Sequence, residues 1–455
     1  VLEHKIADSE TDFIITLDDP TLYSVMDRLL GATRLKALIV GNLQEMSSVA
    51  PTVAMLPSLP QPIEWDATHI SFSQLLDNNR QYRPVPIKDP AQTIAVLQYT
   101  GGTTGMPKGA MLTHANLAAA AGQALLNLGP SGAGLKSGQE TLLVTLPLFH
   151  IYSLTFNLLL GVALAARLIL HTRFELEPVI RDLAEKRVTV FFGVPTMFTA
   201  IVSYTKVQEF DLSALRFSNS GGAPLPVEVH QRFQTLTNCR LQEGWGMTET
   251  CGVGTNTPAH RSHKIGSCGV PLCGVTIRFV SADNPNVAVS YGSVGEICIA
   301  GPNVMRGYWK NPAATAAEML PDGFLRTGDV GSMDSDGYLW IVDRIKDMIL
   351  CSGYNVYPRN IEEAIYRHPA VAEVLVVGVD DAYRGQSPKA FVTLQDGAIA
   401  PTLEAMKAFL KADLGKHEMI QAMEIRTELP RTNVGKLSRK ILFDEEKEKA
   451  RITVA

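Results

Sequence analysis

Apolar residues in the first 200 positions alternate between short continuous runs and stretches with helical spacing. Runs rich in Ile, Val, Phe and Leu predict strands, and apolar residues three or four positions apart predict helices that bury one face. Alternation of the two builds βαβ units and a mostly parallel sheet. The predicted strands span residues 13–17, 37–40, 94–98, 141–145, 167–170 and 188–192. The predicted helices span residues 22–30, 116–126 and 177–185.

Two stretches depart from this alternation. Residues 47–90 are rich in Ser and Pro and show weak periodicity, so we predict a surface loop. The longest apolar run lies at residues 154–170 and is interrupted by Asn157 and Arg167. Since a bilayer span needs about 18 apolar residues, we predict a buried helix followed by a strand.

Beyond residue 260 the pattern changes to short strands and turns. A charged stretch at residues 343–347 follows, and apolar segments of both periods alternate after it. We therefore predict an α/β protein with a large N-terminal domain of mixed βα layers and a β-rich subdomain over residues 1–345. A small α+β domain is predicted over residues 346–455. The predicted strands of the β-rich part span residues 276–280, 295–300 and 338–342.

Composition and charge narrow the class of protein. Hydrophobic residues make up 46% of the 455 positions and charged residues 19%, which is an ordinary globular balance. The net charge of -5 argues against a nucleic-acid partner, which would require clustered excess Lys and Arg. The six Cys form no CxxC pair, so their spacing suggests neither zinc nor a disulfide framework. A reducing, cytoplasmic setting fits best, and the first residues resemble neither a signal nor a transit peptide.

The strongest local motif is YTGGTTGMPKG at residues 99–109, between a predicted strand and a helix opened by Thr113 or His114. Glycines let a backbone bend closely around an anion and turn its N–H groups inward, and hydroxyls and a lysine add donors and charge. The motif is not a Walker A loop, because its lysine is followed by Gly109. A flexible surface loop is the alternative. The predicted contact residues are Thr100, Gly101, Gly102, Thr103, Thr104, Gly105 and Lys108.

A second motif is QEGWGMTET at residues 242–250. Trp245, between two glycines, can lie flat against a planar base, and Thr248 can bond a phosphate. Glu249 supplies a hard oxygen ligand of the kind that Mg²⁺ requires beside phosphates. Core packing for the tryptophan and a solvated helix start for the glutamate are the alternatives.

Two further motifs each carry one candidate residue. In GFLRTGDV, Asp329 at a strand end can accept both hydrogen bonds from a ribose diol, although Thr-Gly-Asp is also common turn chemistry. In LPRTNVGKLSR, Lys436 on a glycine-flanked turn can reach across a domain interface. Alone, that lysine would be an ordinary surface residue.

Taken together, and in their order along the chain, these motifs resemble those of the adenylate-forming superfamily of acyl-CoA synthetases, non-ribosomal adenylation domains and luciferases. They are most similar to bacterial long-chain-fatty-acid–CoA ligases. The resemblance covers essentially the whole chain. It includes LPLFHIY at 146–152, SGGAPLP at 220–226, GEIC at 295–298, RGYWKNP at 306–312 and DRIKDMILCSGYNVYP at 343–358.

The resemblance implies an ATP-dependent acid:coenzyme A ligase that forms an acyl-AMP and then an acyl-CoA thioester, with release of AMP and pyrophosphate. Its implied small molecules are ATP, Mg²⁺, coenzyme A and a carboxylic acid. The resemblance implies that the glycine/threonine loop contacts the β- and γ-phosphates of ATP. It also implies that Thr248 contacts the α-phosphate and that Glu249 binds Mg²⁺. Asp329 and Arg344 are implied at the ribose. The residues implied around the adenine are Gly222, Ala223, Pro224, Glu243, Gly244 and Trp245.

The remaining implied roles concern a mobile C-terminal domain. Lys436 approaches the carboxylate and the α-phosphate during adenylation, and Lys346 is the hinge about which the domain rotates. Gly353 borders the pantetheine tunnel after rotation, and His150 lies in the wall between the acyl pocket and the CoA route. The implied catalytic set is Lys436, Lys108, Thr248, Glu249 and His150.

Two departures from the family pattern are visible. The family's early N-terminal segment is expected upstream of residue 1, and KHEMI at 416–420 replaces the usual Tyr-x-x-Pro. The acyl pocket is predicted over residues 150–160, 193–198 and 246–254. There Gly246 and Gly254 are expected to leave room for a chain. The expected apolar wall consists of Ile151, Val194 and Met197.

We favour a medium- to long-chain fatty acid as substrate, with a dicarboxylic or a cyclic or aromatic acid as the alternative. An adenylation enzyme that loads a carrier protein and a non-catalytic binding protein on the same fold are the rival classes. We expect no appended carrier sequence with a phosphopantetheine serine, and the charged motif residues are all present, which weakens both rivals. Further candidate partners are a second copy in a homodimer, a membrane surface contacted peripherally, and a lysine acetyltransferase acting on Lys436.

Overall fold

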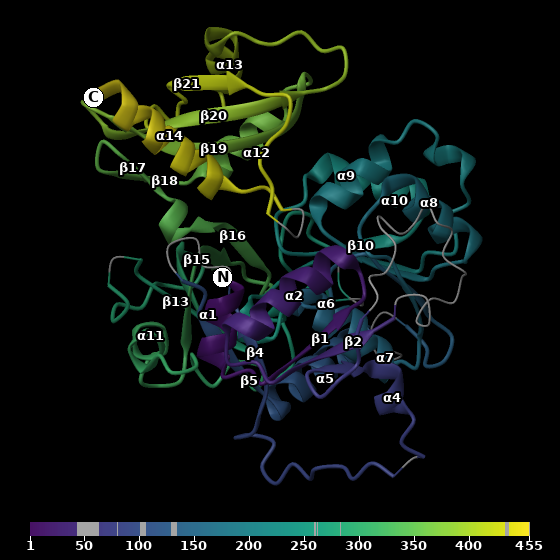
Figure 1. Cartoon of the computed structure of the whole chain (residues 1–455). Helices are drawn as coiled ribbons and strands as arrows, with labels where there is room; N and C mark the ends of the chain where they lie inside the picture. Colours follow the sequence, from purple (N-terminus) through teal and green to yellow (C-terminus); the bar gives the residue numbers. More distant parts are fainter. Residues whose placement is uncertain are drawn as a thin grey trace. The chain divides into compact units, whose positions relative to one another are not determined.

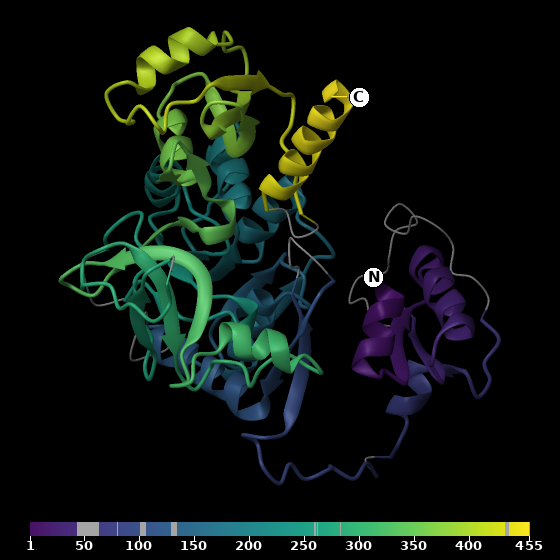
Figure 2. The ribbon, with the colours of Figure 1, turned by 90° about the vertical axis from the view of Figure 1, so that its left-hand side faces the viewer.

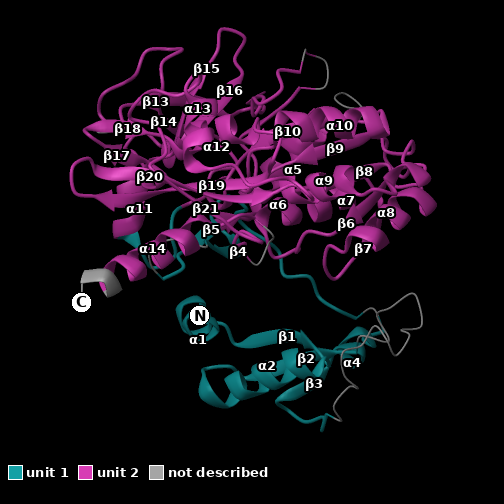
Figure 3. Cartoon of the chain, turned by 90° about the horizontal axis from the view of Figure 1, so that it is seen from above, with its two compact units in different colours: residues 1–111, 307–312 teal, residues 112–306, 313–455 magenta. Residues whose placement is uncertain are grey.

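The computed structural model describes residues 1–42, 63–79, 81–100, 106–128, 134–258, 261, 263–282, 284–432 and 436–454. Figure 1 labels many of its helices and strands. The chain divides into two compact units, a smaller one of residues 1–111 and 307–312 and a larger one of residues 112–306 and 313–455 (Figure 3). The predicted domain boundary at residue 345 stays a prediction.

The smaller unit contains a parallel sheet in the order β1-β2-β3 and a two-stranded sheet of β4 with β5. Helix α2 begins where Asp19 accepts hydrogen bonds from the backbone N–H groups of Thr21 and Leu22, both at 3.0 Å, which caps the helix. Leu29 of this helix packs with Leu38 of β2 in a small core. The elements are α1 (Leu2–Ser9), β1 (Phe13–Leu17), α2 (Pro20–Ala32), β2 (Ala37–Gly41), β3 (His69–Ser71), α4 (Phe72–Leu76), β4 (Ile94–Tyr99) and β5 (Gly109–Thr113).

The predicted surface loop at residues 47–90 is wrong in part, because β3 and α4 lie within it. The Asp66 carboxylate accepts from the backbone N–H groups of Thr68 and His69, both at 2.7 Å, and this turn directs the chain into β3. The strand then pairs with the edge of β2. A strand of three residues is too short to show a hydrophobic period, so the sequence alone does not predict it. Residues 47–62 and 80 lie outside the described residues.

The larger unit is built on a seven-stranded sheet in the order β12-β11-β10-β9-β8-β6-β7, as predicted mostly parallel. The edge strands β11 and β12 run antiparallel. Helices α9 and α10 pack together through Phe198 and Phe233, whose ring centroids lie 5.0 Å apart at 90°. The strands are β6 (Thr141–Val144), β7 (Arg167–Leu170), β8 (Val190–Gly193), β9 (Phe217–Ser220), β10 (Arg240–Trp245), β11 (Thr255–Asn256) and β12 (Val270–Pro271).

Short and long helices connect these strands. The predicted helix before the strand at 167–170 is confirmed, with one π-helical turn in its middle. There the Thr155 hydroxyl donates to the backbone O of Cys251 at 2.7 Å. The helical elements are α5 (His114–Leu128), α6 (Ile151–Ser153), η2 (Leu154–Leu159), α7 (Leu160–Ala163), α8 (Leu176–Glu185), α9 (Pro195–Ser203), η3 (Val207–Glu209), α10 (Val227–Thr237) and η4 (Thr248–Thr250).

A four-stranded antiparallel sheet in the order β13-β14-β15-β16 forms the β-rich part that the sequence predicts. The strands predicted at 276–280 and 295–300 are confirmed at both ends. The elements are β13 (Thr276–Val280), β14 (Gly295–Ala300), α11 (Pro312–Glu318), β15 (Leu325–Met333), β16 (Leu339–Arg344) and η5 (Ile345–Asp347).

The C-terminal residues form a five-stranded sheet with helices on both faces (Figure 2). Alternation along β19 explains this arrangement, because Val374 and Val376 pack with α12 and α13, while Leu375 and Val377 pack with Leu442 of α14. The elements are β17 (Ile349–Cys351), β18 (Tyr354–Val356), α12 (Pro358–Tyr366), β19 (Val371–Asp381), β20 (Gly385–Leu394), α13 (Leu403–Leu410), β21 (Ala422–Ile425) and α14 (Arg439–Val454).

A buried ionic cluster holds the start of α14. The Arg439 guanidinium contacts Asp343 Oδ1 at 3.2 Å, Asp347 Oδ2 at 3.4 Å and Glu362 Oε2 at 2.5 Å. Glu362 also accepts from the backbone N–H of Val376 at 2.8 Å. One arginine therefore ties the end of β16, the turn η5 and helix α12 to the last helix.

All six cysteines lie in the described part of the chain as free thiols. Cys251, in the left-handed conformation with φ 54°, ends the turn η4 and is fully buried. Burial raises the pKa of its thiol to about 12. Across the described residues, none of the helices combines the length and apolar character that a membrane span requires.

Candidate functional site

A buried carboxylate lies where β15, β16 and β10 meet. Asp329 is 3% exposed, and its Oδ1 lies 2.9 Å from Arg344 Nε, the residue opposite it in the antiparallel register. Its Oδ2 accepts from Trp245 Nε1 at 2.7 Å. The predicted position of Asp329 at a strand end is wrong, because a bulge after Val330 lets β15 continue its pairing with β16.

This arrangement leaves part of the hydrogen-bonding capacity of the carboxylate available. A carboxylate can accept about four hydrogen bonds, and the arginine and the tryptophan supply one to each oxygen. The negative charge of Asp329 raises the pKa of Arg344, whose side chain is half exposed. A permanent cation and a buried anion therefore lie side by side, with lone pairs left for a further hydroxyl donor.

Lys436 lies against the turn at Gly222. Gly222 has a φ of +81°, and a Cβ at this position would overlap Lys436 Nζ and Cε. The position therefore requires glycine for two independent reasons. Burial lowers the pKa of Lys436 to about 8, and the positive charge of Arg344 adds to the effect. The lysine thus shares the electrostatic environment of the Asp329–Arg344 pair.

His150 joins the same group. It precedes α6, and its Nδ1 accepts from the backbone N–H of Tyr152 at 3.3 Å. Burial, followed by the positive charge of Lys436, lowers the pKa of His150 to about 4, so the imidazole is neutral at pH 7. The structure therefore brings together His150, Lys436 and the glycine turn that the sequence singles out.

The turn η4 places Thr248 and Glu249 directly after β10. Glu249 is 6% exposed, and its backbone O accepts from Met305 N at 2.7 Å, which holds the turn in place. Burial and then the charge of Arg344 lower the pKa of Lys346, while Glu249 acts in the opposite direction. These carboxylates and cations consequently form one electrostatic cluster at the end of the parallel sheet.

The smaller unit holds the remaining phosphate-loop candidates. The backbone N–H of Thr100 donates to Lys108 O at 2.9 Å, which closes the base of the loop. Lys108 Nζ lies 4.1 Å from the ring centroid of Tyr308, within cation–π distance. Gly101, Gly102, Thr103, Thr104 and Gly105 lie outside the described residues.

Gly353 lies at the exposed tip of the hairpin between β17 and β18. Ser352 and Gly353 have φ values of 52° and 81°, as expected for a two-residue turn of type I′. A Cβ at Gly353 would meet nothing within 4 Å. Ala223 and Pro224 are also exposed.

Gly246 and Gly254 do not leave open space for a chain, so that expectation is wrong. A Cβ at Gly246 would lie 2.5 Å from the backbone C of Gly252, and one at Gly254 would lie 2.9 Å from the Trp245 ring. Gly244 is similar, since a Cβ there would lie 2.9 Å from Thr255 O. These glycines allow protein segments to approach one another. The predicted wall residues Ile151, Val194 and Met197 are buried.

Sequence reasoning missed a polar patch beside the SGG turn. Tyr152 donates its hydroxyl hydrogen bond to Asn219 Oδ1 at 2.8 Å, and a Cβ at Gly221 would lie 3.0 Å from the tyrosine ring. Asn219 faces Gln242 in the register of β9 and β10, and no described residue bonds either amide atom of Gln242. The signal available in the sequence is the alternation along QEGW. This alternation places Gln242 and Glu243 on opposite faces of β10. On the face of Glu243, its Oε1 lies 3.6 Å from His230 Nδ1.

Comparisons with known proteins agree with this geometry. The family model "AMP-binding enzyme" matches residues 2–309, and the model "AMP-binding enzyme C-terminal domain" matches residues 360–436. A long-chain-fatty-acid–CoA ligase of Bacillus subtilis is 37% identical over 98% of this chain and 79% of its own length. A feruloyl-CoA synthase of an Amycolatopsis species is 39% identical over 78% of this chain and 69% of its own length.

A solved structure shows the same architecture. The ATP-bound MatB of Rhodopseudomonas palustris superposes with a TM-score of 0.81 and 28% identity, covering 98% of this chain and 81% of MatB. The first family model alone spans more than half of the chain, and several relatives exceed 30% identity over most of their own length. The chain therefore belongs to the AMP-binding enzyme family.

Proposed function

We propose that the chain is an ATP-dependent acid:coenzyme A ligase that makes an acyl-AMP and then an acyl-CoA thioester. The observation that carries the proposal is the position of Lys436, which reaches the glycine turn at Gly222 in the electrostatic environment of Asp329 and Arg344. The relatives named as fatty-acyl-CoA and feruloyl-CoA ligases support the same reaction class.

The chemistry explains why such a cluster is needed. A carboxylate is a poor electrophile, and its attack on the α-phosphate of ATP brings two anions into contact. Catalysis of this step therefore consists mainly of positioning and of neutralising charge. Lys436 supplies the mobile cation, Asp329 accepts the ribose hydroxyls, and Arg344 balances the charge of Asp329. The acid becomes a mixed anhydride with AMP, and pyrophosphate leaves.

The donor set fits a magnesium ion bound with ATP. Glu249 is a buried carboxylate, and Thr248 beside it carries a hydroxyl, which are the hard oxygen donors that Mg²⁺ prefers. In this proposal Glu249 holds the ion, and the ion supplies neutralisation of the phosphate charge.

The second half-reaction requires a thiol to reach the acyl carbon where Lys436 lies during the first. We propose that residues 346–455 form a mobile domain that rotates about Lys346 and presents Gly353 in place of Lys436. At Gly353 the exposed hairpin has no side chain to obstruct a pantetheine arm. Such alternation is a hinge motion between two productive states.

A medium- to long-chain fatty acid is the proposed substrate, in line with the relatives named long-chain-fatty-acid–CoA ligase. The buried amide of Gln242 favours a second candidate, an aromatic acid with a ring oxygen. A buried amide without a partner costs free energy, and a ligand hydroxyl would supply the missing hydrogen bond. The feruloyl-CoA synthase among the relatives agrees with that candidate.

An ATP/pyrophosphate exchange assay with a panel of acids tests the proposal. We expect exchange with an acid of one of these two classes, and thioester formation when CoA is added. Gln242→Leu should favour the alkyl acids over the ring-hydroxylated ones if the amide reads the substrate. Exchange without any thioester on CoA would indicate a carrier-protein-loading enzyme, and no exchange with any acid would exclude adenylation.

The pH dependence of adenylation should carry the signature of Lys436. Its pKa is lowered to about 8, and the protonated ammonium is the active form, so kcat/KM should fall by about tenfold per pH unit above that value. Lys436→Arg keeps the positive charge at higher pH, so the pH at which kcat/KM begins to fall should rise. An unchanged alkaline limb in Lys436→Arg would show that another group titrates.

We further propose a cytoplasmic enzyme that forms a homodimer and contacts membranes peripherally when it collects its acid. Acetylation of Lys436 would silence it, because the modification removes the charge that the first half-reaction needs. Intact-mass measurement of protein from its native cells reports that modification.

A further inference from the structure

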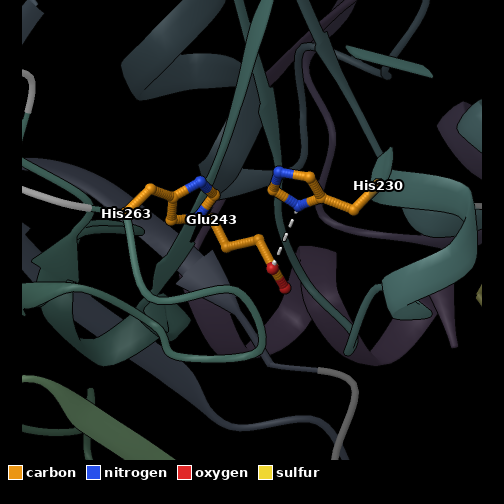
Figure 4. Close-up of side chains that lie close together, drawn as sticks. All are labelled: His230, Glu243 and His263. Atoms are coloured by element: carbon orange, nitrogen blue, oxygen red, sulfur yellow. Dashed lines mark ion pairs between the residues drawn. The ribbon is translucent and has the colours of Figure 1, made fainter. Parts of the chain in front are cut away.

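Three ligand-type side chains converge on the face of the parallel sheet covered by α10. His230 comes from α10, Glu243 from β10 and His263 from the segment between β11 and β12 (Figure 4). One potential ligand atom from each residue lies within 4.8 Å of the other two. We propose that His230, Glu243 and His263 form a binding site for a divalent first-row transition-metal ion, with Zn²⁺ as the expected occupant.

The state of these side chains points to a missing ligand. His230 is 0% exposed, and neither of its ring nitrogens has a hydrogen-bond partner among the described residues. The same holds for Glu243 Oε1 and His263 Nε2. Buried imidazoles and carboxylates are normally paired, and an ion is one of the few occupants that satisfies all three at once.

The distances agree with coordination. His230 Nδ1 and Glu243 Oε1 lie 3.6 Å apart, beyond a normal hydrogen bond. Two ligands of a tetrahedral zinc ion, each bound at about 2.0–2.1 Å, lie about 3.3 Å from each other. The ring centroids of His230 and His263 are 4.6 Å apart, and the rings are tilted by 44°. Small side-chain rotations would therefore let a nitrogen of each ring bind the same ion.

The donor chemistry selects the kind of ion. Two imidazoles and one carboxylate suit Zn²⁺ and related cations, whereas Mg²⁺ and Ca²⁺ prefer oxygen donors throughout. Arg240 places a positive charge near this cluster. Arg240 opposes a cation weakly, because it is exposed and solvent screens it.

The backbone around Glu243 is held before any ion binds. Its carbonyl accepts from Thr257 N and from Thr257 Oγ1, both at 3.0 Å. A bound ion would therefore join a fixed strand to α10 and to the His263 segment. Since Glu243 comes two residues before Trp245, the ion would also stabilise the strand end that holds the Asp329 carboxylate.

Metal titration of the full chain tests the site without reference to catalysis. After dialysis against a chelator, the protein should bind about one Zn²⁺ per chain in equilibrium dialysis with excess Mg²⁺ present. Co²⁺ should bind with the intense visible absorption of a four- or five-coordinate site. Zn²⁺ should also raise the melting temperature.

Ligand variants decide the assignment. His263→Asn replaces a half-buried residue, so it should keep the far-ultraviolet spectrum and melting temperature of the chelated wild type while it lowers Zn²⁺ affinity by at least about 10²-fold. His230→Asn and Glu243→Gln should lose the Co²⁺ spectrum as well. His171→Asn is the matched control, since His171 pairs with Asp182 at 2.7 Å and has no second imidazole in that pair.

The control variant His171→Asn should bind Zn²⁺ with the affinity of the wild type. Two results would each overturn the proposal: absence of stoichiometric Zn²⁺ in the wild type, or unchanged affinity in His263→Asn. Because all readouts are metal content, spectrum and melting, failure of the ligase assay would leave this test intact, and the converse also holds.

Discussion

Replacing Lys436 with Ala is expected to abolish adenylate formation while thioester formation from supplied acyl-AMP continues. The loss in the first half-reaction should be at least about 10²–10³-fold in kcat, the size found when one preorganised charge-stabilising donor is removed. The physical reason is that Lys436 lies at the glycine turn beside the Asp329–Arg344 pair, where the two reacting anions would meet. ATP/pyrophosphate exchange and CoA consumption from synthetic acyl-AMP measure the two steps separately.

Lys440→Ala is the matched control, because Lys440 lies in the first turn of α14, close to Lys436 in sequence, and forms an exposed pair with Asp444. It should leave both half-reactions near the wild-type rate. Lys346→Pro should show the converse defect, since proline restricts the backbone at the proposed hinge and should impair thioester formation more than adenylation. Equal losses in both half-reactions for Lys436→Ala would contradict the proposed exchange of two faces.

Replacing Arg439 with Met should destabilise the C-terminal sheet more than any surface ion-pair change. Arg439 is the shared partner of Asp343, Asp347 and Glu362, and Asp343 and Glu362 are nearly inaccessible to solvent. Removing one member of such a cluster leaves uncompensated buried charge, which costs about 3–5 kcal/mol. Hydrogen exchange of the Val376 amide, which donates to Glu362, should report this loss.

The sign of the pH dependence adds a second check. Burial raises the pKa of Glu362 even with Arg439 present, and loss of the arginine should raise it further. A carboxyl whose pKa is raised on folding weakens the folded state as pH rises above its unfolded pKa. The deficit of Arg439→Met should therefore be smaller at pH 5 than at pH 8.

Arg367→Met serves as the control for Arg439. Arg367 pairs with Asp413 at 3.1 Å, but both side chains are more than a third exposed. An exposed pair of this kind contributes about 0–1 kcal/mol. If both variants reduced Val376 protection equally, the cluster around Arg439 would have no special role.

Local pattern predicted the elements well where a strand is one continuous run of residues. The strands at 13–17, 276–280 and 295–300 begin and end as expected, because each is bounded by a change in hydrophobic period that neighbouring residues reveal. The short strand β3 could not be found in this way, since it exists through pairing with β2.

The sequence named several residues that the structure places near one another, but it could not predict their contacts. The sequence singled out both Trp245 and Asp329, yet their hydrogen bond joins residues 84 positions apart and depends on the meeting of two sheets. Gly246 and Gly254 show the opposite error. A glycine in a motif can provide room for a ligand or for another backbone, and here the atoms of Gly252 and Trp245 take the space.

The metal-type cluster lay beyond sequence reasoning for a related reason. His230 belongs to an amphipathic helix, where a buried position predicts packing, and His263 follows 20 residues after Glu243 with no ligand spacing in common. Only the fold of α10 over β10 and the return of the chain beside β11 bring the three residues together.

The buried thiol of Cys251 has a consequence for the fate of the activated acid. A mixed anhydride reacts readily with thiolates, and Cys251 ends the same turn that carries Thr248 and Glu249. Since its pKa of about 12 leaves almost no thiolate at neutral pH, and its side chain is enclosed, Cys251 is protected from acylation. The activated acid is therefore not lost to this thiol before its external acceptor arrives.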